Sequence, residues 1–320
     1  MKASSVRRLA RLAGVAGLAM ATLGAGQRPR PFEFRQVHMG LPVRILLYAP
    51  TQRRAEIAAE AAFARIAQLD ALMSDYRENS ELRRLETNAG EWTPISPDLL
   101  EVLAMATSIA RATDGAFDPT VGPLVALWRQ ARETKRMPAS ADIEAARALV
   151  SWKLLEVDRR RGAVRLAKRG MRLDLGGIAK GYILGQGLLA LRSAGLGRAL
   201  IESGGDIIVG SGPPGEAGWR VDVPDASSDF TRRARQLTNA AVATSGADEQ
   251  FVDIDGVRYS HVVDPRSGIG VTHNVTARVI ADQGAVADAL ATALSVAGPD
   301  GVQAVLNAYP DVMISLVTGK

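Results

Sequence analysis

Cysteine is absent from the 320-residue chain, and histidine occurs only three times. Without cysteine there is no disulfide framework, no thiolate metal site and no cysteine nucleophile. The histidines, His38, His261 and His273, are too widely spread along the chain to predict a zinc site. The Gly-x-Ser-x-Gly pattern of a nucleophile elbow is also missing, which argues against a serine hydrolase.

Aromatic residues are few (5%), whereas glycine is plentiful (31 residues), which predicts many tight turns and close backbone approaches. The hydrophobic share of 47% and charged share of 23% are ordinary for a globular protein, so disorder is not expected. No repeat period appears, and no linker rich in Pro, Ser or charge divides the chain. We therefore expect one domain over residues 27–320, long enough to bury a substantial core.

Residues 1–26 have the layout of an export signal. A basic start precedes the apolar stretch Leu12–Leu23, which is too short for an ordinary membrane span, and small residues follow it. The pair Arg7-Arg8 is compatible with a twin-arginine route, and an ordinary secretory signal or an uncleaved anchor stays open. We expect an exported, periplasmic protein. Because there is no cysteine, it is not expected to be a Cys-anchored lipoprotein.

The net charge of +5 comes mostly from the leader, which holds four basic residues and no acidic one. The rest of the chain is close to neutral, and no basic patch interleaved with aromatics appears in it, so no nucleic-acid partner is expected. Two remaining basic clusters, Arg159–Arg161 and Arg232–Arg233, are interpreted as solvated loops.

Hydrophobic periodicity predicts helices and strands that alternate irregularly along the chain. Helices are expected at 53–72, 97–112, 142–149, 181–194, 285–297 and 303–308. Strands are expected on both sides of a turn within 32–48, and at 154–157, 163–166, 199–201, 207–209, 221–223, 241–243, 257–263, 275–280 and 312–317. Loops are expected at 73–80 and, stiffened by two prolines, at 117–124. Because a regular βαβ order is missing, we predict an α+β fold with a mixed or antiparallel sheet.

The segment Ala285–Gly298 predicts a buried helix that ends at Gly298-Pro299. An apolar stripe at helical spacing is expected to face the core: Val286, Leu290 and Leu294. Asp288 and Thr292 then share the opposite face, one turn apart. A carboxylate on so apolar a helix needs a partner, and a hard cation such as Mg²⁺ would satisfy both oxygens. The alternative is an Asp288 that is exposed or bonded to a neighbouring loop.

Two glycine-rich segments resemble phosphate loops. Gly210–Gly215 matches G-x-G-x-x-G, but its prolines disfavour entry into a helix, so we interpret it as a turn. Asp174–Gly181 runs from a strand-like segment through Gly176-Gly177 into a helix, where backbone N–H groups and Lys180 could hold a diphosphate. A plain strand-to-helix turn is the equal alternative.

His261 lies just before a turn that contains Pro265 and ends at Gly268. A positioned imidazole is the commonest general base near neutral pH, which makes His261 a candidate. A lone histidine is more often structural, so this residue alone does not decide the function.

Seven segments, in this order, resemble the ApbE family, the FAD:protein FMN transferases. The resemblance runs from about Met39 to Leu294. The segments are 73–80 (Met-Ser-Asp-Tyr…Ser), 114–128 (Asp-Gly-Ala-Phe-Asp-Pro-Thr-Val-Gly-Pro-Leu…Trp), 174–181 (Asp-Leu-Gly-Gly-Ile-Ala-Lys-Gly), 203–206 (Ser-Gly-Gly-Asp), 243–246 (Ala-Thr-Ser-Gly), 260–268 (Ser-His-Val-Val-Asp-Pro-Arg-Ser-Gly) and 287–292 (Ala-Asp-Ala-Leu-Ala-Thr).

The resemblance implies a T-fold-related architecture and Mg²⁺-dependent transfer of FMN from FAD to a threonine hydroxyl of a target flavoprotein, with AMP released. A membrane redox subunit is one acceptor of this kind. The resemblance also implies that Mg²⁺ is held by Asp288, Thr292 and a backbone oxygen at Gly177, with His261 as our candidate base for the threonine. The FAD site would be formed by Met39, Tyr76, Ala116, Phe117, Asp118, Asp174, Lys180 and Val262.

The chain departs from the family pattern at Ala285, where some relatives carry a second acidic residue near the metal. The metal is therefore expected to rely more on water. Two other functions stay open: hydrolysis of FAD to FMN and AMP, and flavin binding in the periplasm without catalysis.

Overall fold

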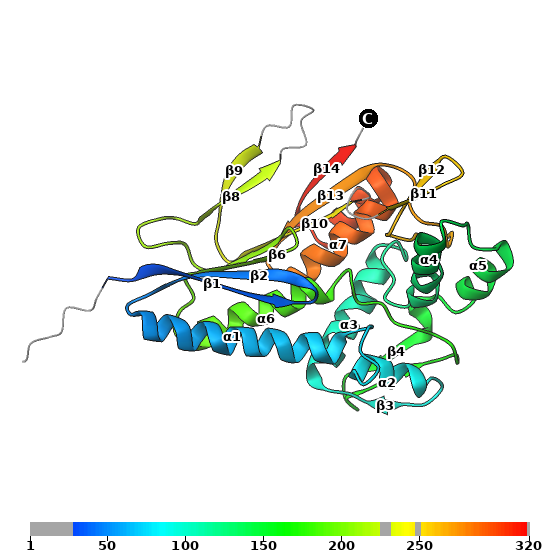
Figure 1. Cartoon of the computed structure of the whole chain (residues 1–320), viewed down its shortest axis with the longest axis horizontal. Helices are drawn as coiled ribbons and strands as arrows, with labels where there is room; N and C mark the ends of the chain where they lie inside the picture. The colour runs from blue at the N-terminus through cyan, green and yellow to red at the C-terminus, as the bar shows by residue number, and fades with distance from the viewer. Residues whose placement is uncertain (1–27, 225–231, 247–250, 319–320) are drawn as a thin grey trace, which may run out of the picture.

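The computed structural model describes residues 28–224, 232–246 and 251–318. These residues form a seven-stranded antiparallel sheet in the order β1-β2-β6-β7-β10-β13-β14 (Figure 1). The antiparallel sheet with packed helices confirms the predicted α+β class. The strands are β1 (Arg30–His38), β2 (Leu41–Ala49), β6 (Ala199–Ser203), β7 (Asp206–Val209), β10 (Ala240–Gly246), β13 (Val275–Ala281) and β14 (Met313–Thr318).

Three helices, α1, α6 and α7, form a layer beneath the main sheet in the view of Figure 1. Helix α6 packs against both α1 and α7, and α7 packs along β10 and β13. The bounds of the helices are α1 (Gln52–Met73), α2 (Glu81–Thr87), α3 (Pro97–Ala112), α4 (Gly122–Thr134), α5 (Ser140–Arg147), α6 (Ala179–Ser193), α7 (Gly284–Ala297) and α8 (Val302–Ala308), with short 3₁₀ turns at Trp152–Leu154 and Gly298–Gly301.

Smaller sheets surround the main one. β3 (Thr93–Pro94), β5 (Ala163–Leu166) and β4 (Leu155–Asp158) form a sheet next to α3, and β11 (Phe251–Ile254) pairs with β12 (Val257–Ser260) near α4. The ribbon of β8 (Trp219–Pro224) and β9 (Arg232–Leu237) packs Trp219 and Leu237 with Val209 and Val242 of the main sheet. The sheet is therefore covered by helices on one face and partly by this ribbon on the other.

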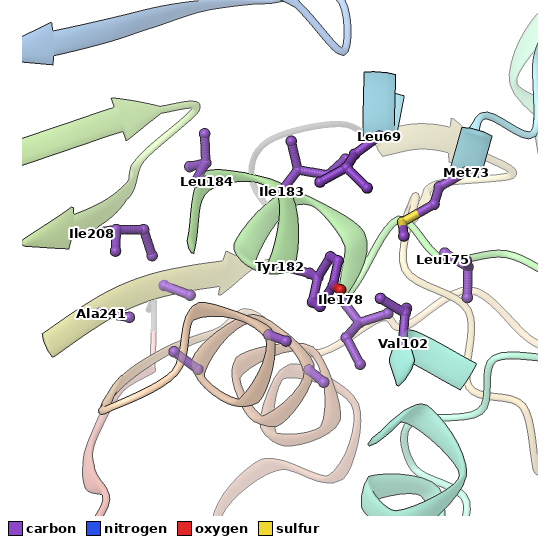
Figure 2. Packing of buried hydrophobic residues seen from close by; sticks show 14 of the residues in the cluster. Leu69, Met73, Val102, Leu175, Ile178, Tyr182, Ile183, Leu184, Ile208 and Ala241 are labelled. Carbon is purple, nitrogen blue, oxygen red and sulfur yellow. The ribbon is translucent and has the colours of Figure 1, made fainter. Parts of the chain in front are cut away.

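The core centres on α6 (Figure 2). Ile183 lies beside Leu69 of α1, and Leu184 lies on the side of the helix nearer to Ile208 of β7. These side chains are at most 5% exposed, so burial of apolar surface holds α6 between α1 and the sheet. The first turn of α6, which follows Ile178, is thereby fixed in place.

Long periodic elements agree with the sequence-based predictions. The predicted strand pair in 32–48 is the hairpin β1–β2, and the helix predicted over 97–112 has these bounds in α3. α3 begins as expected, with Pro97 in its first turn and the hydroxyl of Ser96 accepting a hydrogen bond from the N–H of Leu99. The turn predicted at Gly210–Gly215 follows β7, and Arg159–Arg161 forms the predicted exposed turn.

Three local predictions were wrong. The predicted loop 117–124 ends at Val121, because α4 begins at Gly122 and its proline occupies the first turn, where no backbone donor is needed. Arg232-Arg233 begins strand β9 rather than a loop. The strand expected before Gly176 is reduced to one bridge between Arg172 and Val121.

Helix α7 is buried around almost its whole circumference. Ala287, Ala289, Leu290 and Ala291 are fully buried, and Asp288 is only 4% exposed. The predicted division into a core face and an opposite face was therefore too simple. In the part of the chain that the structure describes, the stretch Gly284–Ala308 is the one helical run that is long and apolar enough to cross a membrane. Half of the residues in its most apolar window are buried inside the protein, which agrees with the position of α7 in the core.

Candidate active site

A cavity of about 280 Å³ lies where α4, α6, α7 and the segment after β12 meet. The cavity brings together almost all of the predicted site residues: Tyr76, Ala116, Phe117, Asp118, Asp174, Gly177, Lys180, His261, Val262, Asp288 and Thr292. Met39 is the exception. It lies in the β1–β2 turn, where its N–H donates to Asp70 Oδ2 at 3.0 Å, and it is not among the lining residues.

Asp288 is fixed by the beginning of α6. Its Oδ2 accepts a hydrogen bond of 3.0 Å from the N–H of Gly181, and no side chain of α6 itself caps that helix. The helix N-terminus carries partial positive charge, so a buried carboxylate is stabilised there. The predicted alternative for Asp288 was exposure or a bond to a neighbouring loop. Asp288 is instead 4% exposed, and this bond joins it to the first turn of helix α6.

The close contact between α6 and α7 depends on two glycines. A Cβ at Gly181 would lie 2.1 Å from the carbonyl oxygen of Gly284, and a Cβ at Gly284 would lie 2.2 Å from that of Gly181. Real Cβ atoms do not approach backbone so closely. Any side chain at either position therefore separates the helices and moves Asp288 away from the α6 N-terminus.

Gly181→Ala is expected to lower the free energy of unfolding by about 1–3 kcal/mol through overpacking. Gly185→Ala is the matched control, because its Cβ would meet nothing within 4 Å in the same helix. Alanine favours helix over glycine there, so the control is expected to gain about 0.5–1 kcal/mol. Urea unfolding followed by circular dichroism measures both, and equal midpoints for the two variants would contradict the close-contact argument.

Gly177 and Thr292 are also in close contact. A Cβ at Gly177 would lie 2.8 Å from the hydroxyl oxygen of Thr292, so the loop before α6 lies directly against α7. The carbonyl oxygen of Thr292 accepts a hydrogen bond of 2.8 Å from Ser295, whose hydroxyl also contacts Ser245 at 3.0 Å. The paired glycines therefore let the loop backbone approach the hydroxyl side chain.

Lys180 lines the cavity and pairs with a buried carboxylate. Its Nζ lies 3.1 Å from Oδ2 of Asp206, whose side chain is 1% exposed. Burial, followed by the charge of Asp288, raises the pKa of Asp206, and the ammonium of Lys180 opposes that rise. The lysine thus favours the ionised form of the Asp206 carboxylate.

A second charged cluster lies on the α4 side of the cavity. Arg129 Nη2 pairs with Asp75 Oδ2 at 2.6 Å and with Asp174 Oδ2 at 3.5 Å, and its guanidinium lies 4.7 Å from the centre of the Tyr76 ring. Burial, then the charge of Asp75, raises the pKa of Asp174, whereas the N–H of Gly176 and the charge of Arg129 lower it. The Tyr76 side chain is exposed, so its ring can stack on a planar ligand.

Asp118 organises the loop that precedes α4. Its Oδ1 accepts hydrogen bonds from the N–H and the hydroxyl of Thr120 at 2.8 and 2.6 Å, and its Oδ2 accepts one from the N–H of Trp152 at 2.8 Å. Burial raises the pKa of Asp118, and these three hydrogen bonds lower it. The carboxylate thus holds the buried residues Ala116 and Phe117 at the cavity wall.

His261 lines the same cavity, half-buried, directly after β12. The next residue, Val262, donates its N–H to the buried hydroxyl of Ser260 and accepts from the N–H of Val271 at 2.9 Å. The predicted turn is present, because the N–H of Gly268 donates to the carbonyl of Asp264 at 2.8 Å. Hydrogen bonds therefore fix the backbone before and after His261, the residue that carries the imidazole.

The comparisons with known proteins agree with this geometry. Residues 39–316 match the model of the ApbE family. The chain belongs to the ApbE family. It is 31% identical over 312 residues to the FAD:protein FMN transferase of Treponema pallidum (strain Nichols), with 90% of this chain and 85% of the relative covered. It is 32% identical over 253 residues to the FAD:protein FMN transferase of Salmonella typhimurium (strain LT2), with 75% and 72% covered.

Solved structures of ApbE proteins share the fold. The apo crystal structure of Pseudomonas stutzeri flavinyl transferase ApbE has a TM-score of 0.81 at 28% identity, with 92% of each chain covered. The ApbE protein of Thermotoga maritima has a TM-score of 0.77 at 30% identity, with 91% of this chain and 97% of that chain covered. Membership of the ApbE family makes this chain a transferase, as the sequence predicted.

Sequence reasoning missed three charged residues of this ApbE site: Arg129, Arg132 and Asp206. Both arginines line the cavity from α4, three residues apart, and that helix was interpreted partly as a loop. The helical spacing of Leu124 and Trp128, both buried, was a signal for it. Asp206 was visible only as the end of the Ser203–Asp206 segment, with no pattern that connects it to Lys180.

The oxygen donors at the cavity fit a hard divalent cation. Asp288, the hydroxyl of Thr292 and the backbone of Gly177 supply oxygen, the ligand type that Mg²⁺ prefers. Within residues 28–224, 232–246 and 251–318, no three His, Asp or Glu side chains gather as a ligand group. A cation with one carboxylate ligand needs further oxygens, which phosphates of a substrate or water can supply.

Proposed function

We propose that this ApbE-family protein transfers FMN from FAD to a threonine hydroxyl of an acceptor flavoprotein, depends on Mg²⁺ and releases AMP. One observation carries the proposal: a single cavity is lined by a carboxylate and a hydroxyl at Asp288 and Thr292, by the Lys180 ammonium and by the His261 imidazole. Dinucleotide cleavage needs a cation site, an anion-binding group and a base, and this cavity supplies candidates for each.

In the proposed reaction, the threonine oxygen attacks the phosphorus of the FMN half of FAD. The new bond is a phosphodiester between threonine and FMN, and the bond that breaks joins that phosphorus to the oxygen of AMP. His261 accepts the threonine proton as the bond forms. AMP leaves with the electron pair of the broken bond.

Asp288, Thr292 and the carbonyl oxygen of Gly177 would hold Mg²⁺. The cation, when bound, would neutralise the diphosphate and the charge that develops on AMP. Lys180, in the first turn of α6, would hold the same diphosphate, because an ammonium and the partial positive charge of a helix N-terminus both attract anions. The bond from Gly181 to Asp288 keeps the carboxylate at this helix end.

The isoalloxazine or adenine ring of FAD would lie against exposed Tyr76 and the wall of Ala116, Phe117 and Val262. Asp118 would act through the loop that it organises, since its oxygens accept hydrogen bonds from Thr120 and Trp152. Met39 does not line the cavity, and in this proposal it belongs to the FAD site only through the neighbouring β1–β2 turn.

Two other functions compete with transfer: hydrolysis of FAD, with water in place of threonine, and flavin binding alone. Purified protein is incubated with FAD, Mg²⁺ and a threonine-bearing acceptor, and the acceptor is then weighed by mass spectrometry. A covalent FMN adduct on the acceptor supports transfer. Free AMP without an adduct supports hydrolysis, and the absence of both products supports binding alone.

The place of action is also part of the proposal. The export-signal pattern of residues 1–26, which lie outside the described residues, supports a periplasmic enzyme whose acceptors include a membrane redox subunit. Fusing residues 1–40 to a reporter that works only after export tests this. A reporter that remains in the cytoplasm and stays inactive would remove the periplasmic assignment and leave the transfer reaction untouched.

A further inference from the structure

The ion pair of Lys180 and Asp206 joins the cavity to the main sheet. Lys180 lines the cavity, whereas Asp206, the first residue of β7, is 1% exposed and is not among the lining residues. Their Nζ and Oδ2 atoms are 3.1 Å apart. An ammonium has three N–H donors, so pairing with Asp206 is compatible with contact to an anion in the cavity.

Asp206 is itself held by backbone. Its Oδ1 accepts a hydrogen bond of 3.3 Å from the N–H of Thr244 in β10. The tight turn between β6 and β7 precedes it, with Gly204 and Gly205 both at positive φ. A Cβ at Gly204 would lie 3.9 Å from Lys180 Nζ and 2.7 Å from a methyl group of Leu41. The carboxylate is therefore a rigid anchor for a flexible lysine.

We propose that Asp206 is a positioning residue, whose buried carboxylate anchors the Lys180 ammonium where it contacts the diphosphate of FAD. The inference rests on the proposed function, because it takes a dinucleotide diphosphate as the anion in the cavity. A lysine side chain carries a compact charge on a flexible four-carbon stem. An ion pair with Asp206 restricts its conformations before FAD binds, so less conformational entropy is lost on binding.

The sign of the effect separates this role from a general electrostatic one. A buried negative charge near the cavity repels an anion, so a purely electrostatic effect predicts tighter FAD binding when the charge of Asp206 is removed. Anchoring of Lys180 predicts weaker binding instead. A role confined to folding predicts a lower free energy of unfolding, with no change in the FAD affinity of the folded protein.

The test is a double-mutant cycle of Asp206→Asn and Lys180→Met. The dissociation constant of FAD is measured by quenching of flavin fluorescence in the absence of acceptor, once with Mg²⁺ and once with a chelator. Asp206→Asn alone is expected to raise the constant about tenfold, the loss expected for one charge-assisted contact. In the Lys180→Met background the same substitution is expected to change it by less than about twofold.

Asp98→Asn is the matched control. Asp98 also pairs with a cation, Arg65, and accepts a hydrogen bond from the Tyr182 hydroxyl of α6, but it does not line the cavity. Its FAD affinity is expected to match that of the wild type. Equal losses from Asp206→Asn with and without Lys180, or tighter FAD binding, would overturn the positioning role.

Asp206→Glu replaces Asp206→Asn in the cycle if the asparagine variant does not fold. It keeps the charge but moves it by one methylene group, so a smaller loss of FAD affinity is expected, again only when Lys180 is present. Binding and transfer are read separately. A wild-type protein that binds FAD but labels no acceptor contradicts the proposed function, whereas an additive cycle contradicts the positioning role.

Discussion

Asp288→Asn is expected to lower Mg²⁺-dependent FMN transfer by at least about a hundredfold, the range seen when a group that stabilises transition-state charge is removed. Asparagine keeps an oxygen that can accept from the N–H of Gly181, so the contact between α6 and α7 is retained. What it removes is the single carboxylate among the proposed cation ligands. The rate of acceptor labelling over a Mg²⁺ titration measures the effect.

Asp282→Asn is the matched control, because it removes one negative charge just before the same helix from an exposed side chain. We expect its Mg²⁺ titration to overlay that of the wild type. A titration that is unchanged in Asp288→Asn would refute the assignment of Asp288 as a metal ligand. Asp288→Ala, which also breaks the bond to Gly181, is expected to lose activity and stability together.

Sequence alone was enough for elements whose periodicity is long and regular. Helix α3 and the hairpin β1–β2 were predicted because apolar residues recur about every 3.6 positions in a helix and every second position in a strand. Val43, Ile45 and Leu47 of β2 follow the second pattern, and all three are buried. Helix α4 was not recognised as a whole, because Gly122 and Pro123 usually interrupt helices. Both residues are tolerated in the first turn of a helix, and the prediction did not consider that they could begin α4.

Strand β9 shows a second limit. Ala234, Arg235 and Gln236 are all exposed, so these residues show no alternation of buried and exposed side chains. The strand exists because its backbone pairs with β8, with Trp219 opposite Leu237. Such pairing is a property of the tertiary structure, and no local pattern in residues 232–237 encodes it.

The candidate site was predictable where its residues lie in short segments of unusual composition. Asp288 and Thr292 stood out as polar residues on an apolar helix, and Gly177 as part of a glycine pair. Asp206 did not stand out, because its importance comes from Lys180, 26 positions earlier in the chain, and the fold brings the two within 3.1 Å. Pairing across elements is what a single sequence does not reveal.

His261→Ala is expected to keep FAD binding and to lower the rate of FMN transfer about a hundredfold to ten-thousandfold, the range of general base catalysis. The backbone around His261 is fixed by the bonds of Ser260 and Val262 with Val271, so removing the imidazole leaves the cavity wall in place. Flavin fluorescence measures binding, and mass spectrometry of the acceptor over time measures transfer.

His273→Ala is the control for loss of a histidine, because its Nε2 contacts the carbonyl oxygen of Val296 at 3.1 Å and the residue does not line the cavity. It is expected to transfer FMN at nearly the wild-type rate. Full transfer by His261→Ala would remove this residue from the reaction. Loss of FAD binding in that variant would instead assign His261 to holding the substrate, because a base that acts only on the incoming threonine contributes nothing to the affinity for FAD.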